Sequence, residues 1–155
     1  MAAPTTDTGP TAGSLEASIG GLAITPGGNN GFVNGAFAIG WYASADVILS
    51  VRHLGSFSDN GEDNSYFSDR IAVDFAGPPR GVSPFVGLGI GVAYGESVNE
   101  TVLAGLHAGA RIFIKPSTFV QLLGGYDHFV SRTEDRTEVF EDAVSTFTLS
   151  FGVTF

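Results

Sequence analysis

Few side chains in this sequence are of the types that do chemistry. Of the 155 residues only 15% are charged, and there is no cysteine, which excludes disulfide scaffolds, thiolate zinc sites and cysteine nucleophiles. Walker, dinucleotide-binding and zinc motifs are absent. The glycine stripe at 87–91 alternates like a strand and lacks the following helix that a phosphate loop requires. The remaining candidates are three histidines, charged residues within alternating segments, and an acidic group in the connections.

The acidic group accounts for most of the net charge of −9. Such a surface is simply solvated, or it binds Ca²⁺, Mg²⁺ or a cationic partner. The run at 59–64 (DNGEDN) offers oxygen ligands but departs from the EF-hand spacing, so no metal site is predicted. The acidity also argues against a nucleic-acid partner. The connections carry Arg132 and Arg136 against the acids Asp59, Glu62, Asp63, Glu96, Glu100, Glu134, Asp135, Glu138, Glu141 and Asp142.

The elements that must position these residues are strands. Mean hydropathy is positive, at +0.21, yet no apolar run approaches the ~20 residues of a membrane helix. Apolar residues instead alternate with small or polar ones, which is typical of half-buried strands. The clearest case runs from Phe147 to Phe155. Eight such segments are predicted, at about 14–25, 32–43, 46–58, 65–77, 84–96, 101–114, 118–131 and 143–155.

The connections between these segments alternate in character. Those after the second, fourth and sixth segments are short, whereas the others are more polar. An even number of antiparallel strands then puts all short turns at one end and all acidic loops at the other. Residues 1–13, which are small and polar with proline and glycine, are predicted to be a flexible leader, and 14–155 a single barrel domain.

Volume decides which face of the strands points inward. Eight stripes of large apolar side chains would overfill an eight-stranded barrel, whereas Gly, Ala, Ser and Thr fit there. A soluble barrel would also present the glycine stripe at 87–91 to water, which gives little solubility. The sequence therefore predicts an all-β, eight-stranded, antiparallel up-and-down transmembrane barrel with its apolar face toward lipid.

Aromatic residues gather near both ends of the predicted strands. Such a distribution is typical of the two aromatic girdles of a membrane barrel. The girdles are predicted to hold Trp41, Tyr42, Phe75, Phe85, Phe113, Phe119 and Phe155 at the short-turn end, and Phe32, Phe57, Tyr66, Phe67, Tyr94, Tyr126 and Phe129 at the loop end.

Three stretches resemble those of a known family. The final strand, 150–155 (SFGVTF), resembles the assembly signal of Gram-negative outer-membrane proteins, with Phe151, Val153 and Phe155 as its signal residues. The stretches 84–91 (PFVGLGIG) and 109–113 (GARIF), the latter followed by 124–127 (GGYD), are similar to strands of the eight-stranded outer-membrane barrels that include OmpX and the OmpA membrane domain.

This resemblance covers about 14–155 and carries several implications. It implies residence in a bacterial outer membrane with short turns in the periplasm, contact with outer-membrane lipid and lipopolysaccharide, and insertion by the barrel-assembly machinery. No signal peptide is visible at the start of the sequence, so we expect a mature form of an exported chain.

By parity, six charged residues within the predicted strands face the lumen, together with His107 and Gln121. Three acids and three bases make this lumen formally neutral. We expect salt bridges among them, because unpaired charge in a narrow lumen is costly. The network is interpreted as a plug that fixes the strand register, or as a gate that opens when partners switch. Its members are Glu16, Arg52, Arg70, Asp74, His107, Arg111, Gln121 and Asp127.

The other two histidines, His53 and His128, face outward by the same parity. Lipid A deacylases of this fold carry a His-Ser-Glu triad on the outer wall, with the serine two residues after the histidine. Here Ser131 follows His128 by three positions, with Glu134 and Glu138 further on, so the pattern does not match. We expect no enzyme, no cofactor and no metal.

The sequence thus predicts a non-catalytic outer-membrane barrel with a plugged polar lumen and a structural or surface-interaction role. The alternative is a narrow channel for small or apolar solutes, similar to OmpW-like proteins, with Leu103, Phe113, Leu123 and Phe129 along an apolar path. A third hypothesis is a homo-oligomer or the membrane subunit of a larger envelope assembly.

Overall fold

The alternating segments of the sequence form eight strands. The computed structural model describes residues 9–24, 32–58, 64–79, 81–96, 98–130 and 143–155. Within these residues the strands are β1 (Leu15–Ile24), β2 (Phe32–Tyr42), β3 (Val47–Ser58), β4 (Asn64–Ala76), β5 (Val82–Gly95), β6 (Val98–Lys115), β7 (Thr118–Phe129) and β8 (Ala143–Thr154). Each predicted segment has its strand, so the all-β prediction is confirmed.

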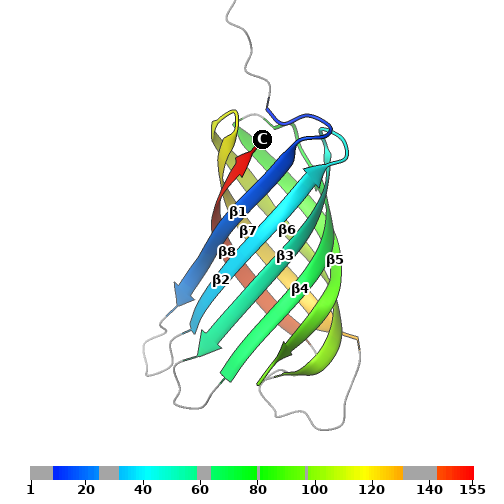
Figure 1. Cartoon of the computed structure of the whole chain (residues 1–155), viewed down its shortest axis with the longest axis vertical. Coiled ribbons are helices and arrows are strands. Elements are labelled where there is room, and N and C mark those ends of the chain that lie inside the picture. The colour runs from blue at the N-terminus through cyan, green and yellow to red at the C-terminus, as the bar shows by residue number, and fades with distance from the viewer. Residues whose placement is uncertain (1–8, 25–31, 59–63, 80, 97, 131–142) are drawn as a thin grey trace, which may run out of the picture.

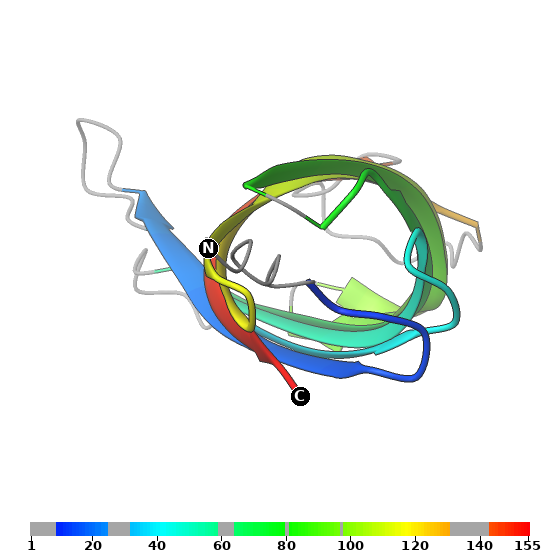
Figure 2. The same ribbon diagram turned by 90° about the horizontal axis from the view of Figure 1, so that it is seen from above.

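The strands close into a barrel in chain order, with every neighbouring pair antiparallel and β8 returning to β1 (Figures 1 and 2). The strand register is staggered around the barrel. A path that starts at Val92 of β5 and steps to the paired residue on each next strand, through Asp69 and His53, returns to β5 at Val82 and not at Val92. A register staggered in this way tilts the strands by about 40° from the barrel axis. The end of the barrel at which β2 leads to β3, β4 to β5 and β6 to β7 is here called the turn end; the opposite end is called the loop end.

Large apolar side chains point away from the lumen on all eight strands. On β5, the side chains of Val86, Leu88 and Ile90 are exposed. Ser83 and Phe85, which lie nearer the turn end and have the opposite parity, are buried. Such a belt is what a lipid-facing barrel wall presents, because lipid is the apolar phase that covers it. In the described part of the chain, no helix is long and apolar enough to span a membrane.

The predicted aromatic girdles are wrong for several members. Because side chains alternate across a strand, the neighbours of outward residues point inward. The structure accordingly buries Tyr42, Tyr66, Phe85, Phe119 and Phe129 inside the barrel, at 4% exposure or less. By contrast Trp41, Phe57, Phe75, Tyr126 and Phe155 are exposed on the outside.

Glycines on the lumen side make room for these inward rings. A Cβ atom on Gly109 would lie 2.6 Å from Cζ of Phe85, and one on Gly152 would contact the ring of Phe119. At both glycines an aromatic side chain packs directly against the strand backbone, which only a residue without a Cβ atom allows. The lumen therefore holds large rings set against bare backbone, and not only the small residues that the volume argument predicted.

The barrel closes where the two ends of the described chain meet. The amide of Leu15 donates to the carbonyl of Phe155 at 2.8 Å, and the amide of Phe155 donates back to Leu15 at 2.9 Å. Ahead of β1, the amide of Gly13 donates to the carbonyl of Tyr42, and Pro10 is buried. Residues 9–13 thus lie against the turn end of the barrel (Figure 2).

Candidate functional site

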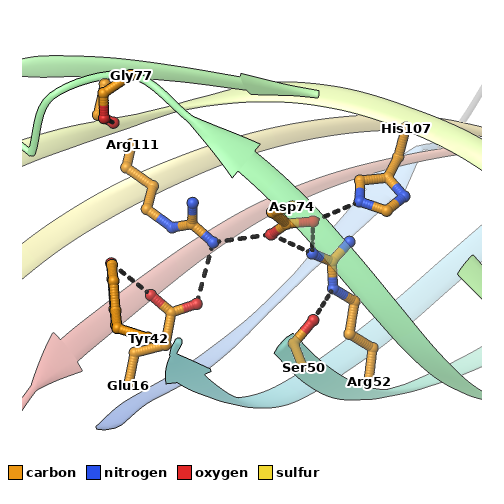
Figure 3. Close-up of polar contacts among 9 residues, drawn as sticks. Glu16, Tyr42, Ser50, Arg52, Asp74, Gly77, His107 and Arg111 are labelled. Carbon is orange, nitrogen blue, oxygen red and sulfur yellow. Dashed lines mark hydrogen bonds and ion pairs between the residues drawn. The ribbon is translucent and has the colours of Figure 1, made fainter. Parts of the chain in front are cut away.

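The polar network of the lumen is centred on Arg111 of β6. Its Nη2 donates to Oε1 of Glu16 and to Oδ2 of Asp74, both at 3.0 Å. These carboxylates come from β1 and β4, so one guanidinium joins three strands across the lumen (Figure 3). Arg111 is only 1% exposed. A cation buried so fully needs both charge partners and hydrogen bonds to be tolerated.

Asp74 is shared by three cationic or titratable side chains. Besides Arg111, it accepts two hydrogen bonds of 2.6 Å from Nη2 of Arg52, and its Oδ1 lies 2.6 Å from Nε2 of His107 (Figure 3). Arg52 is steadied in turn by Ser50, whose Oγ accepts from its Nε at 3.0 Å. Asp74 itself is fully buried, and its carboxylate is therefore the hub of the network.

Aromatic side chains close the space around Arg111. Its guanidinium carbon lies 4.5 Å from the ring centroid of Phe85 and 5.8 Å from that of Phe119. Tyr42 donates its hydroxyl to Oε2 of Glu16 at 3.0 Å. Cation–π contact adds to the ionic contacts when the cation is desolvated. We call this layer the inner seal: Glu16, Tyr42, Asp74, Phe85, Arg111 and Phe119.

A second ion pair lies nearer the loop end. Nη1 of Arg70 on β4 donates to Oδ2 of Asp127 on β7 at 2.5 Å, and the Nε and Nη2 of Arg70 donate to Oγ of Ser68. The Asp127 carboxylate lies directly over Gly105, where a Cβ atom would collide with it. This pair is separate from the Asp74 hub, so the six lumen charges form two groups.

Between the second ion pair and the loop end, the lumen holds a hydrophobic cluster. Tyr66, Ala93, Leu103 and Phe129 are buried together, with Leu54 and Val144 packed against them. They come from β3, β4, β5, β6, β7 and β8, so the cluster joins six of the eight strands. We call these six residues the outer seal. It differs from the inner seal in holding no ion pair among its members.

Between the seals lies a cavity of about 50 Å³. Space of this size holds a few water molecules where polar groups line it. Its lining combines the charged side chains of both ion-pair groups with a stripe of hydroxyls on β8. The polar residues that line it are Ser18, Arg52, His53, Arg70, His107, Gln121, Asp127, Thr146, Thr148 and Ser150.

The structure places the remaining candidates as follows. Gln121 is buried in the lumen as the cross-strand partner of Arg111. Of the predicted apolar path, Leu103 and Phe129 lie in the outer seal, Leu123 lines the cavity, and Phe113 packs on Phe119 with centroids 5.7 Å apart. The apolar residues are therefore split between three levels.

The predicted assembly-signal residues lie on the outer wall of β8. Phe151, Val153 and Phe155 are exposed by 50%, 40% and 70%. The acidic-loop candidates Asp59, Glu62, Asp63, Glu134, Asp135 and Glu138 fall outside the described residues, as does Ser131. In the described part, no cluster of three or more His, Cys, Asp or Glu residues could hold a metal ion.

One polar site on the outer wall was missed by sequence reasoning. Asp69 of β4 faces outward and pairs with His53 of β3, with 2.7 Å between Oδ1 and Nδ1. The signal was available, since Asp69 is one position from the inward Arg70 and therefore has outward parity. Only the strand register shows that it lies opposite His53.

Comparisons with solved structures agree on the architecture. The N-terminal barrel domain of Pseudomonas aeruginosa OprF superimposes with a TM-score of 0.64 at 15% identity, covering 94% of this chain and 100% of that one. Neisserial surface protein A (NspA) gives a TM-score of 0.63 at 14% identity, covering 91% and 94%. This chain has the fold of the small outer-membrane barrels.

A designed transmembrane β-barrel also shares the fold, with a TM-score of 0.51 at 13% identity over 96% of this chain and 98% of the design. No protein-family model matches the sequence, and no curated protein matches it. At these identities the likeness to outer-membrane barrels is one of fold, so function must be argued from the lumen and the outer wall.

Proposed function

We propose that this chain resides in a bacterial outer membrane as a non-catalytic barrel with a plugged lumen, in a structural or surface-interaction role. The observation that carries the proposal is Arg111, which is 1% exposed and ties β1 to β4 across the lumen through Glu16 and Asp74. An arginine held in this way occupies the cross-section that a pore would need. The fold shared with OprF and NspA supports the membrane setting.

The plug consists of two layers in series. The inner seal is ionic and aromatic, whereas the outer seal is apolar, and the cavity lies between them. An ion that crossed the barrel would have to lose its water at the outer seal and displace Arg111 at the inner one. Removing either layer alone should therefore leave the pathway closed.

Planar-bilayer recording of the reconstituted protein tests this arrangement. The wild type, Arg111→Ala and Phe129→Ala are expected to show no unitary current, while the double variant conducts. Leu106→Ala, an exposed residue of β6, is the matched control and stays closed. Steady conductance of the wild type would overturn the plugged-lumen proposal.

A narrow channel is the second candidate, and the cavity is the observation that favours it. Arg52, Arg70 and His107 line it together with hydroxyl groups of β8, which is a lining suited to small polar solutes. In this alternative the outer seal opens on its own and the Arg52–Asp74 contact changes partner. Wild-type conductance that is lost or altered in Arg52→Ala would support the channel against the plug.

The proposal includes partners set by the outer wall. Its apolar belt is covered by outer-membrane lipid and lipopolysaccharide, and the strand ending in Phe151, Val153 and Phe155 is read by the barrel-assembly machinery. A homo-oligomer or a larger envelope complex would use the same wall. Heat-modifiable gel mobility tests the membrane barrel itself, and native mass spectrometry in detergent tests the oligomeric state; solubility without detergent would contradict the membrane setting.

A further inference from the structure

A polar cluster interrupts the apolar outer wall on β3, β4 and β5. The side chains of His53 and Asp69 are 44% and 47% exposed. Their outward neighbours along the same strands, Val51 and Ile71, are exposed apolar residues of the belt. Ionisable residues on a lipid-facing wall are costly and are rarely present without a polar partner. The cluster therefore calls for an explanation that the plugged lumen does not supply.

The cluster is held in one geometry by hydrogen bonds. Oδ1 of Asp69 lies 2.7 Å from Nδ1 of His53, and Oδ2 accepts from the hydroxyl of Tyr94 at 2.9 Å. Asp69 is thus fixed at both oxygens. Because Nδ1 of His53 is engaged by Asp69, its Nε2 is the ring nitrogen left to meet a molecule outside the barrel.

Aromatic rings pack together beside these polar groups. The ring of Phe67 stacks against His53 on one side, with centroids 6.2 Å apart, and against Tyr94 on the other, at 5.7 Å. Phe57 meets the Phe67 ring edge-on at 5.4 Å. Gly55 lies beneath, since a Cβ there would be 3.2 Å from Phe67 Cε1. The faces of the Phe67 ring are therefore turned toward its neighbours, and the stacked rings form an apolar group beside the His-Asp-Tyr polar group.

The cluster lies toward the loop end of the wall. Tyr94 is next to Gly95, the last residue of β5, and Phe57 is next to Ser58, the last residue of β3. In the proposed orientation this is the outer leaflet, close to the level of lipid headgroups. A headgroup at that level meets the stacked rings and the Nε2 of His53 together.

The chemistry of His53 selects among headgroups. A neutral imidazole with a proton on Nδ1 offers Nε2 as an acceptor, and a charged one offers it as a donor. A phosphate fits only the charged form, and it approaches the Asp69 carboxylate; an ammonium fits only the neutral form. A hydroxyl both donates and accepts, so it fits either form, and the C–H groups of a sugar can pack beside the stacked rings of Phe67 and Tyr94.

We propose that His53, Asp69 and Tyr94, with Phe57 and Phe67, form a site for the sugar headgroup of an outer-leaflet glycolipid. This inference rests on the proposed outer-membrane setting but not on the state of the lumen. The sugar hydroxyls bond Nε2 of His53, while Asp69 and Tyr94 orient the His53 ring. The C–H groups of the sugar lie against the stacked rings. The acyl chains lie along the apolar belt on the turn-end side of the site.

Nuclear magnetic resonance of the full chain in phosphocholine micelles tests the site. Dodecyl maltoside supplies a sugar on an alkyl chain, maltose supplies the sugar alone, and dodecyldimethylamine oxide supplies the chain alone. We expect intermolecular contacts between maltoside sugar protons and the rings of His53 and Phe67, saturating with concentration. Maltose should bind far more weakly, because the belt no longer contributes, and the amine oxide should give no contact at His53.

Variants separate the site from general detergent binding. His53→Ala is expected to weaken maltoside binding by about fivefold, the effect of losing one neutral hydrogen bond, and Tyr94→Phe should weaken it less. His128→Ala removes the other exposed outward histidine of the described wall and should leave binding unchanged. Gel mobility before and after heating verifies that each variant is folded.

Several outcomes would overturn the proposal. They are sugar contacts spread evenly over the belt, equal binding in His53→Ala and the wild type, and contacts at His53 from a second copy of the chain in place of maltoside. A folded, non-conducting barrel that gives any of these results refutes the glycolipid site alone. A conducting wild type with sugar contacts at His53 refutes the plug alone.

Discussion

Arg52 and Arg70 stand directly opposite each other on β3 and β4, yet their guanidinium groups bind different carboxylates on different strands. Arg52 turns to Asp74 of the inner seal, whereas Arg70 reaches across the lumen to Asp127 of β7. Like charges on paired residues repel each other. The two carboxylates therefore do more than neutralise the lumen, because they keep these two arginines apart.

The Arg70–Asp127 pair should be costly to break from one side. Asp127→Asn leaves Arg70 without its counter-charge beside Arg52, and we expect a loss of ~3–5 kcal/mol in the free energy of unfolding. Urea unfolding in micelles measures it. The double variant Arg70→Met/Asp127→Leu removes both charges and should lose much less; an equal loss in both would contradict the pairing argument.

Asp74 should be the most sensitive acid of the lumen. Asp74→Asn weakens contacts to Arg52, His107 and Arg111 at once, so its destabilisation should exceed that of Asp127→Asn and be more than ~3 kcal/mol. Asp46, exposed in the turn after β2, provides the control: Asp46→Asn should change stability by less than ~0.5 kcal/mol. Similar unfolding midpoints for the two variants would rule out the hub role.

Gly152 should tolerate no side chain, because its lumen face is covered by the Phe119 ring. We expect Gly152→Ala to destabilise the barrel by ~1–3 kcal/mol through overpacking, and Phe119→Leu in that background to restore part of the loss. Gly35→Ala is the comparison, since a Cβ there has no atom within 4 Å. Thermal unfolding followed by circular dichroism reads out all three, and a neutral Gly152→Ala would mean that the ring moves freely.

Phe155 should matter for assembly more than for stability. Its backbone bonds to Leu15 in both directions and would survive removal of the ring. Phe155→Ala should therefore refold in micelles like the wild type but accumulate less in outer membranes on expression. Leu149→Ala, at an exposed residue of β8, should accumulate normally. Equal membrane levels of the two variants would remove Phe155 from the assembly signal.

Much of the fold could be predicted because the two-residue period of side-chain direction is local. Val86, Leu88 and Ile90 show their common face in the sequence itself, and the same parity indicates the inward direction of Arg111. The aromatic rings were misplaced where one volume argument was applied to whole strands. Phe119 fits inside because Gly152 on the next strand has no side chain, and that pairing depends on the register.

The ionic contacts could not be predicted from parity alone. Parity indicates that Arg111 faces the lumen, but its partner Glu16 lies far away in sequence, on β1. Which acids it reaches depends on the stagger accumulated around the closed barrel. The same limit explains Asp69, whose outward direction was local information while its contact with His53 required the β3–β4 register.

The mutual bonds between Leu15 and Phe155 have a consequence for how the chain folds. The seam between β1 and β8 joins the residues most distant in sequence, and such contacts carry the largest loop-closure cost. Until β8 exists, β1 has an open edge that lipid cannot satisfy. Closure of this barrel therefore requires the last strand, and a truncated form that ends before β8 would leave the edge of β1 unpaired.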